Sequence, residues 1–197
     1  MPQPPPPAAD PPHTVEEAVE ALRRATAERP VQPLAFLELG DLLGRLGRFD
    51  EGARVFEEGL ALEPRAIILR VGLGYLNLAR NDRAAARAQF LEVRAAAPER
   101  YDGMVGLANV LALDGEYAAA VDLYRRALEL QPDNVVTRIA LARALLEMGD
   151  RETGEAELRR ASAGGPEHVG RAITALAATP HGRLFLRPGD AAAFLRR

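Results

Sequence analysis

The chain has few side chains of the types that carry out chemistry, and their spacing matches no catalytic or metal-binding motif. Its 3 histidines, His13, His168 and His181, are scattered, and it contains no cysteine. A chain without cysteine has no disulfide, thiolate metal site or cysteine nucleophile. The sequence also shows no metal-ligand spacing, no glycine-rich phosphate loop and no nucleophile elbow. It therefore predicts a protein that is not an enzyme and that uses no metal or cofactor.

The composition favours packed helices. Of the 197 residues, 48% are apolar, 27% are charged and only 5% are aromatic, with alanine and leucine dominant. Because the formal net charge is −3, we do not expect the chain to bind nucleic acid. No apolar run reaches the roughly 18 residues of a membrane span, and the N-terminus shows no secretory signal. We expect a cytoplasmic protein without a membrane span, and the periplasm stays open as an alternative.

Two segments precede the main body of the chain. Residues 1–13 hold seven prolines and predict a disordered tail, with a docking peptide for a proline-binding groove as the alternative. Residues 14–32 predict an amphipathic helix of about four turns, because Thr14 can cap it and its apolar residues share one face. Two acidic residues in the first turn, Glu16 and Glu17, suit the start of this helix.

A period of 34 residues organises the chain beyond the first helix. Prolines recur at this spacing, at Pro30, Pro64, Pro98, Pro132 and Pro166. Eight residues before each proline is a large apolar residue: Leu22, Phe56, Phe90, Tyr124 and Leu158. The midpoint of each complete period is a residue that tolerates positive φ: Gly47, Asn81, Gly115 and Gly149. Each period therefore predicts two helices, here named helix A and helix B, that bury their faces by stacking on the next pair.

This helix–turn–helix period resembles the tetratricopeptide repeat. The resemblance implies an all-α fold, a right-handed α-solenoid, with repeats at residues 33–66, 67–100, 101–134 and 135–168. Residues 14–32 then form an N-terminal half-repeat, and the third repeat matches the family pattern best. The second repeat departs from it: Arg70 and Asn77 stand where large apolar residues are usual, and Arg83 replaces an aromatic residue. A two-residue shift of its helix A would move Tyr75 into the core.

Residues 169–197 predict a C-terminal capping helix followed by a tail. Val169, Ile173 and Leu176 form one apolar stripe, as expected of a helix that closes the end of an array. The tail contains an apolar Leu-Phe-Leu run and predicts a short helix capped by Asp190. Covering the last repeat is one role for this tail, and folding into the groove or docking a partner is the other.

The resemblance also implies a concave groove lined by the A helices. The groove-facing positions of the family correspond here to Leu34, Leu37 and Asp41, to Ile68, Val71, Tyr75 and Leu78, to Val105 and Asn109, and to Val136, Ile139 and Arg143. The clamp with which some family members hold a C-terminal carboxylate is not expected, because its key positions are aliphatic here and only Asn109 matches.

An aliphatic floor suits an apolar peptide or helix, with polar groups fixing its register. We therefore expect a non-catalytic interaction module, such as an adaptor, assembly factor or peptide-holding chaperone, whose partner is a protein or peptide with an apolar segment. Two alternatives stay open: a self-associating scaffold that forms a homo-oligomer, and a regulatory subunit of a partner enzyme.

Charge also varies between repeats. The second repeat carries six arginines against three acidic residues, and the third carries two against six. Solvated surfaces explain such a difference. The alternative is that alternating charge aligns head-to-tail or subunit contacts, or holds the basic tail at residues 169–197 on an acidic repeat.

Overall fold

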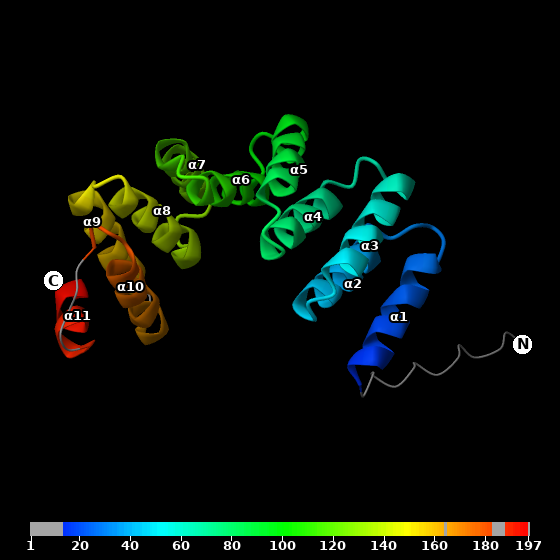
Figure 1. The fold of residues 1–197 in the computed structure, drawn as a ribbon, viewed down its shortest axis with the longest axis horizontal. Helices are drawn as coiled ribbons and strands as arrows, with labels where there is room; N and C mark the ends of the chain where they lie inside the picture. The colour runs from blue at the N-terminus through cyan, green and yellow to red at the C-terminus, as the bar shows by residue number, and fades with distance from the viewer. Residues whose placement is uncertain (1–13, 164, 183–187, 197) are drawn as a thin grey trace, which may run out of the picture. The chain divides into compact units, whose positions relative to one another are not determined.

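The computed structural model describes residues 14–163, 165–182 and 188–196, which form eleven α-helices and no strand (Figure 1). The predicted disordered tail at residues 1–13 and the Leu-Phe-Leu run lie outside the described residues. The helices fall into two compact units, an N-terminal unit of residues 1–80 and a C-terminal unit of residues 81–197.

The N-terminal unit contains four helices in sequence: α1 (Val15–Ala27), α2 (Pro33–Arg45), α3 (Phe49–Leu62) and α4 (Ile67–Ala79). Each helix contacts the next, and α2 also contacts α4. The centre of the unit is fully buried and combines residues of α2, α3 and α4, among them Leu39, Leu43, Phe56 and Leu69.

The C-terminal unit contains α5 (Arg83–Ala96), α6 (Tyr101–Leu113), α7 (Tyr117–Leu130), α8 (Val135–Glu147), α9 (Arg151–Ser162), α10 (Pro166–Ala178) and α11 (Pro188–Leu195). Helices α5 to α10 each contact the next, and α10 also contacts α8 and α11. The terminal core joins α8, α9, α10 and α11 through Leu146, Leu158, Leu176 and Leu195.

The helix boundaries follow the 34-residue period. Helices α2, α4, α6 and α8, the A helices, begin at Pro33, Ile67, Tyr101 and Val135. Helices α3, α5, α7 and α9, the B helices, begin at Phe49, Arg83, Tyr117 and Arg151. The turn between A and B uses positive φ at each predicted midpoint, with values of 74° at Gly47, 63° at Asn81, 81° at Gly115 and 84° at Gly149. The predicted turn residues are therefore confirmed.

Side-chain caps fix several helix starts. The Thr14 hydroxyl accepts from the backbone N–H of Glu17, and the Glu17 carboxylate accepts from the N–H of Thr14, which completes a capping box and confirms Thr14 as the cap of α1. Asp82 and Asp150 cap the B helices α5 and α9 in a similar way.

Two of the large apolar residues of the period, Phe56 and Phe90, pack onto glycine. In the N-terminal unit the Phe56 ring lies between Gly40 of α2 and Gly72 of α4, where an added Cβ would stand 2.5 Å and 2.6 Å from ring atoms. In the C-terminal unit the Phe90 ring of α5 lies against Gly106 of α6 just as closely. A B helix therefore reaches the backbone of the A helix that follows it, because that helix has no side chain at the contact.

The described part of the tail covers the last repeat. Helix α11 contacts α9 and α10, and Leu195 is buried with an exposed fraction of 2%. The Arg159 guanidinium stacks 4.5 Å above the centre of the Phe194 ring, and the Ser162 hydroxyl donates to the carbonyl of Leu195. Helix α11 begins at Pro188, so Asp190 lies in its first turn and the prediction that it precedes the helix as the cap is wrong.

Charged residues of neighbouring repeats pair within each unit. Arg83 and Arg87 of α5 pair with Asp114 in the turn after α6, and Arg87 also pairs with Glu116. The hydrogen bond from Arg87 to Glu116 raises the pKa of that guanidinium. The excess of arginine in the second repeat therefore meets the excess of acid in the third.

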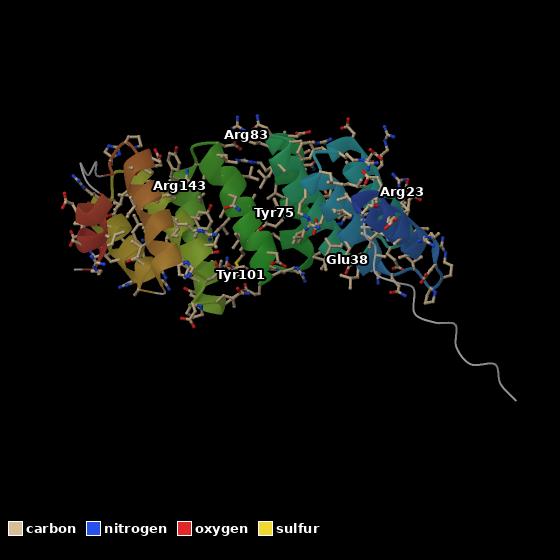
Figure 2. The ribbon with its side chains drawn as sticks, turned by 90° about the horizontal axis from the view of Figure 1, so that it is seen from below. Arg23, Glu38, Tyr75, Arg83, Tyr101 and Arg143 are labelled. Carbon is tan, nitrogen blue, oxygen red and sulfur yellow. The ribbon has the colours of Figure 1, made fainter. Side chains whose placement is uncertain are left out.

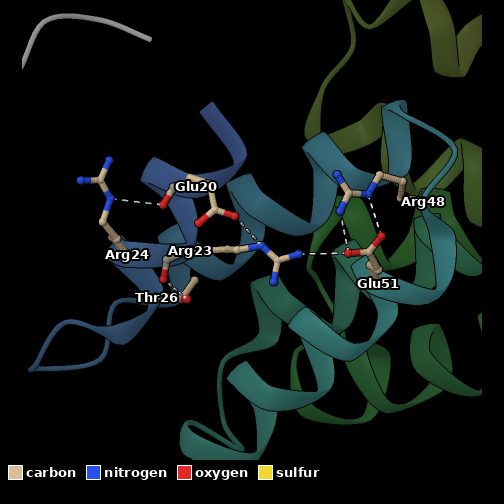
Figure 3. A network of polar contacts seen from close by, with 6 residues as sticks. All are labelled: Glu20, Arg23, Arg24, Thr26, Arg48 and Glu51. Carbon is tan, nitrogen blue, oxygen red and sulfur yellow. Dashed lines mark hydrogen bonds and ion pairs between the residues drawn. The ribbon is translucent and has the colours of Figure 1, made fainter. Parts of the chain in front are cut away.

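A comparable network joins the first helices of the N-terminal unit (Figure 3). Glu51 of α3 accepts from Arg48 at 2.7 Å and from Arg23 of α1 at 3.0 Å. These hydrogen bonds, above all those from Arg48, lower the pKa of the Glu51 carboxyl. The groups are largely exposed, so they orient the helices more than they stabilise them.

The glycine contact is tested by two alanine variants in the same unit. Gly106→Ala should lower the free energy of unfolding by about 1–3 kcal/mol, because its methyl group collides with the Phe90 ring. Gly170→Ala is the control: among the described residues, no side chain and no backbone outside its own helical turns lies within 4 Å of its added Cβ, and the helix gains up to about 1 kcal/mol from alanine. Urea unfolding followed by circular dichroism measures both, and equal effects of the two changes would contradict the packing described.

The role of α11 is tested by Leu195→Ala. Loss of this buried side chain should lower the free energy of unfolding of the C-terminal unit by about 2 kcal/mol or more. Leu130→Ala, at an exposed position of α7, should change it by about 0.5 kcal/mol or less. If the two variants unfold at the same urea concentration, α11 does not act as a cap.

Candidate functional site

The predicted groove residues of the N-terminal unit lie on α2 and α4, and two of the apolar ones are well exposed. Leu34 has an exposed fraction of 55% and Tyr75 of 36%. The side chain of Tyr75, on α4, is labelled in Figure 2. Leu37 and Ile68 are half-buried and pack against the core of the unit. This surface therefore combines exposed apolar side chains with a supported apolar base.

Tyr75 faces away from the core. Helix α4 begins at Ile67, as the period requires, so the two-residue shift that would bury Tyr75 does not occur. Asn77 is buried instead, and its Oδ1 has no hydrogen-bond partner among the described residues. A buried amide without a full set of partners costs free energy, so the second repeat keeps its register despite a local penalty.

Val71 and Leu78 contribute less surface than the other predicted positions of α4. Val71 is buried, with an exposed fraction of 8%, and Leu78 is half-buried. A charged substitution at Val71 would disturb packing as well as binding, so exposed neighbours are the better positions for testing this surface.

Asp41 is the predicted polar residue of the N-terminal unit. Solvent reaches its side chain, yet neighbouring protein atoms desolvate the carboxyl and raise the pKa of Asp41. The positive charge of Arg45, one turn further along α2, acts in the opposite direction. Asp41 can therefore accept hydrogen bonds at the edge of this apolar surface.

In the C-terminal unit the predicted residues lie on α6 and α8. Val136 is the most exposed, at 62%, whereas Val105 and Ile139 are half-buried. Ile139 packs against the terminal core and keeps part of its surface open. The three aliphatic side chains thus follow the A helices of this unit, as the sequence predicts.

Hydrogen bonds hold the polar residues of this surface in place. The Tyr124 hydroxyl of α7 donates to Oδ1 of Asn109 on α6 at 2.7 Å. The Tyr101 and Thr137 hydroxyls, on α6 and α8, lie 2.5 Å apart and share a hydrogen bond. The side-chain oxygen of Asn109 is therefore engaged in a hydrogen bond within the third repeat. The side-chain N–H groups of Asn109 are the donors that it can offer a ligand.

A pocket opens between α8 and α10. Its volume is about 590 Å³, and it is lined by Ile139, Arg143, Gly170, Arg171, Thr174, Ala175 and Ala178. Ile139 and Arg143, both predicted from the sequence, come together here. Arg143 is labelled in Figure 2. The other five residues belong to α10 and were not predicted, because α10 begins at Pro166, before residue 169 where the next step of the 34-residue period would start, and lies out of register with the A helices.

The two histidines in the described part of the chain do not line this pocket. His13 lies outside the described residues, His168 lies in α10, and the Nδ1–H of His181 donates to the carbonyl of Leu146 at 3.0 Å. Among the described residues, no group of three or more His, Asp or Glu side chains is placed to hold a metal ion. No helix in the described ranges is long and apolar enough to cross a membrane.

Comparisons with known proteins agree on one family. Models of two tetratricopeptide repeat families match the chain, one over residues 111–178 and the other over residues 15–66, 37–92 and 71–135. The comparison with curated proteins gives no match.

Several solved structures share the fold. TTC0263, a thermophilic tetratricopeptide repeat protein of Thermus thermophilus, has a TM-score of 0.70 and 22% identity over 83% of this chain and 91% of its own. YrrB, described as having an unusual peptide-binding site, has a TM-score of 0.63 and 18% identity over 90% and 93% of the two chains. MamA from Desulfovibrio magneticus RS-1 has a TM-score of 0.66 and 20% identity over 77% and 85%.

The hydrogen bond to Asn109 is tested by Tyr124→Phe. Removing the hydroxyl leaves the buried side of Asn109 without its donor and should lower the free energy of unfolding by about 1 kcal/mol. Tyr117→Phe, on the same helix, should leave stability unchanged because its hydroxyl makes no hydrogen bond with the described residues. Equal losses in the two variants, measured by urea unfolding, would show that the bond does not support the repeat.

Proposed function

The chain belongs to the tetratricopeptide repeat family, and from that premise we propose that it binds an apolar segment of a partner protein on its A helices. Its action is binding, and no chemical step is assigned to it. The observation that carries the proposal is the exposure of aliphatic and aromatic side chains on those helices, above all Leu34, Tyr75 and Val136. Exposure of these apolar side chains to water is unfavourable in free energy, and a bound apolar segment would shield them from water.

The neighbouring side chains support this interpretation. Leu37 and Ile68 in the N-terminal unit, and Ile139 in the C-terminal unit, are packed against the cores beneath them. A ligand would therefore meet a rigid apolar base, and rigid sites lose less conformational entropy on binding than flexible ones. The peptide-binding site described for YrrB, a protein of the same fold, adds support by likeness.

Charged substitutions at exposed positions test the proposal without touching the core. Leu34→Asp combined with Val136→Asp should weaken capture of peptides selected from a displayed random library by about tenfold or more, because each carboxylate must be desolvated on binding. Fluorescence anisotropy with a labelled selected peptide gives the dissociation constants.

The matched control is Leu62→Asp combined with Leu130→Asp, two similarly exposed leucines on the B helices α3 and α7. This control should bind as the unmodified chain does, and circular dichroism should show unchanged helix content in all three proteins. If the B-helix variant loses binding and the A-helix variant keeps it, the ligand surface is not on the A helices.

A further inference from the structure

We propose that the pocket between α8 and α10 binds an acidic side chain, aspartate or glutamate, that stands next to an aliphatic residue in the bound peptide. The inference rests on the proposed function and narrows it, since it states what chemistry the ligand must carry at one place. The pocket belongs to the C-terminal unit alone, and the five residues of α10 that line it lie beyond the fourth predicted repeat, which ends at residue 168.

The floor of the pocket is apolar. Ala175 is buried, Ile139 is supported by the terminal core, and Ala178 adds a small side chain at the end of α10. The volume of about 590 Å³ is within the range of ligand sites and has room for more than one side chain. The small residues of α10 thus leave space that an aliphatic side chain can fill.

The polar part of the pocket carries positive charge from two helices. Arg143 of α8 and Arg171 of α10 both line it, and none of its described lining residues is acidic. Neither guanidinium makes a hydrogen bond or ion pair with any residue that the structure describes. The Thr174 hydroxyl donates to the carbonyl of Gly170, so the two arginines are the donors that remain for a ligand.

Other arginines of the C-terminal unit show the contrast. Arg138, also on α8, donates to Glu157 at 2.7 Å and to the carbonyl of Pro132. The charge of Arg138 is already paired inside the protein, whereas Arg143 and Arg171 have no such partner in the part of the chain that the structure describes. A guanidinium presents a planar set of donors that matches a carboxylate, and it pairs more strongly beside apolar surface than in open water.

The apolar side chains beside the pocket favour an acidic residue that is part of a peptide chain over a free acid. The apolar floor continues from the pocket along α8 to Val136, so a chain that seats its carboxylate between the arginines has further apolar contacts available beyond it. The predicted ligand is therefore an acidic and aliphatic segment.

Selection from a displayed library of short random peptides tests the inference with the full chain. The displayed peptides are fused at their C-terminus, so any carboxylate that is selected comes from a side chain. We expect enrichment of aspartate or glutamate adjacent to leucine, isoleucine or valine. A selected peptide, acetylated and amidated at its ends, should lose about tenfold in affinity when Arg143→Gln and Arg171→Gln are combined.

A double-mutant cycle assigns the loss to the proposed contact. Changing the acidic residue of the peptide to its amide should weaken binding to the unmodified chain and have little further effect on the Arg143→Gln/Arg171→Gln variant. The control is Arg125→Gln, which removes an exposed arginine of α7 outside this pocket and should leave affinity unchanged.

The two ways in which the test can fail are distinct. If no peptide is enriched, the proposed peptide-binding function is itself contradicted, and this inference with it. If peptides are enriched without a preference for acidic residues, or the acid-to-amide change weakens both proteins equally, only the role of Arg143 and Arg171 is overturned.

Discussion

Phe56 lies against the backbones of Gly40 and Gly72, and this contact between an aromatic ring and glycine shows the constraint that sets the distance between helices. Phe90 meets Gly106 in the same way in the C-terminal unit. The ring needs a position without Cβ, and the helix needs a large side chain to fill the space beside it. Within each unit, each B helix contacts the helix that follows it, so stacking of this kind covers one side of that helix.

The fold could be predicted because its determinants are local and recur. Gly47, Gly115 and Gly149 adopt positive φ where the spacing places them, and Asn81 does so at the remaining midpoint. The candidate site was predicted only in part. The burial of Val71 depends on packing that its sequence position does not reveal. The pocket beside Arg143 is completed by α10, which does not begin at a step of the 34-residue period.

The arginines fall into two groups, those with hydrogen-bond or ion-pair partners among the described residues and those without. Arg83 stands where an aromatic residue is usual, and its guanidinium donates instead to the carbonyl of Leu113 at 2.7 Å and pairs with Asp114. The departure of the second repeat from the family pattern therefore has a structural use. Arg143 and Arg171 have no such partners among the described residues and flank an apolar pocket, and unpaired charge beside apolar surface is the combination from which the proposed ligand chemistry follows.

The most direct test of the account is methyl NMR of the full chain during titration with a selected peptide. If the peptide binds to the A helices, the largest chemical-shift changes in the C-terminal unit should fall on the methyl groups of Val105, Val136 and Ile139. The methyl groups of Leu130, on a B helix, should stay nearly unchanged. Large shifts at Leu130 with unchanged signals from Val136 and Ile139 would contradict the account.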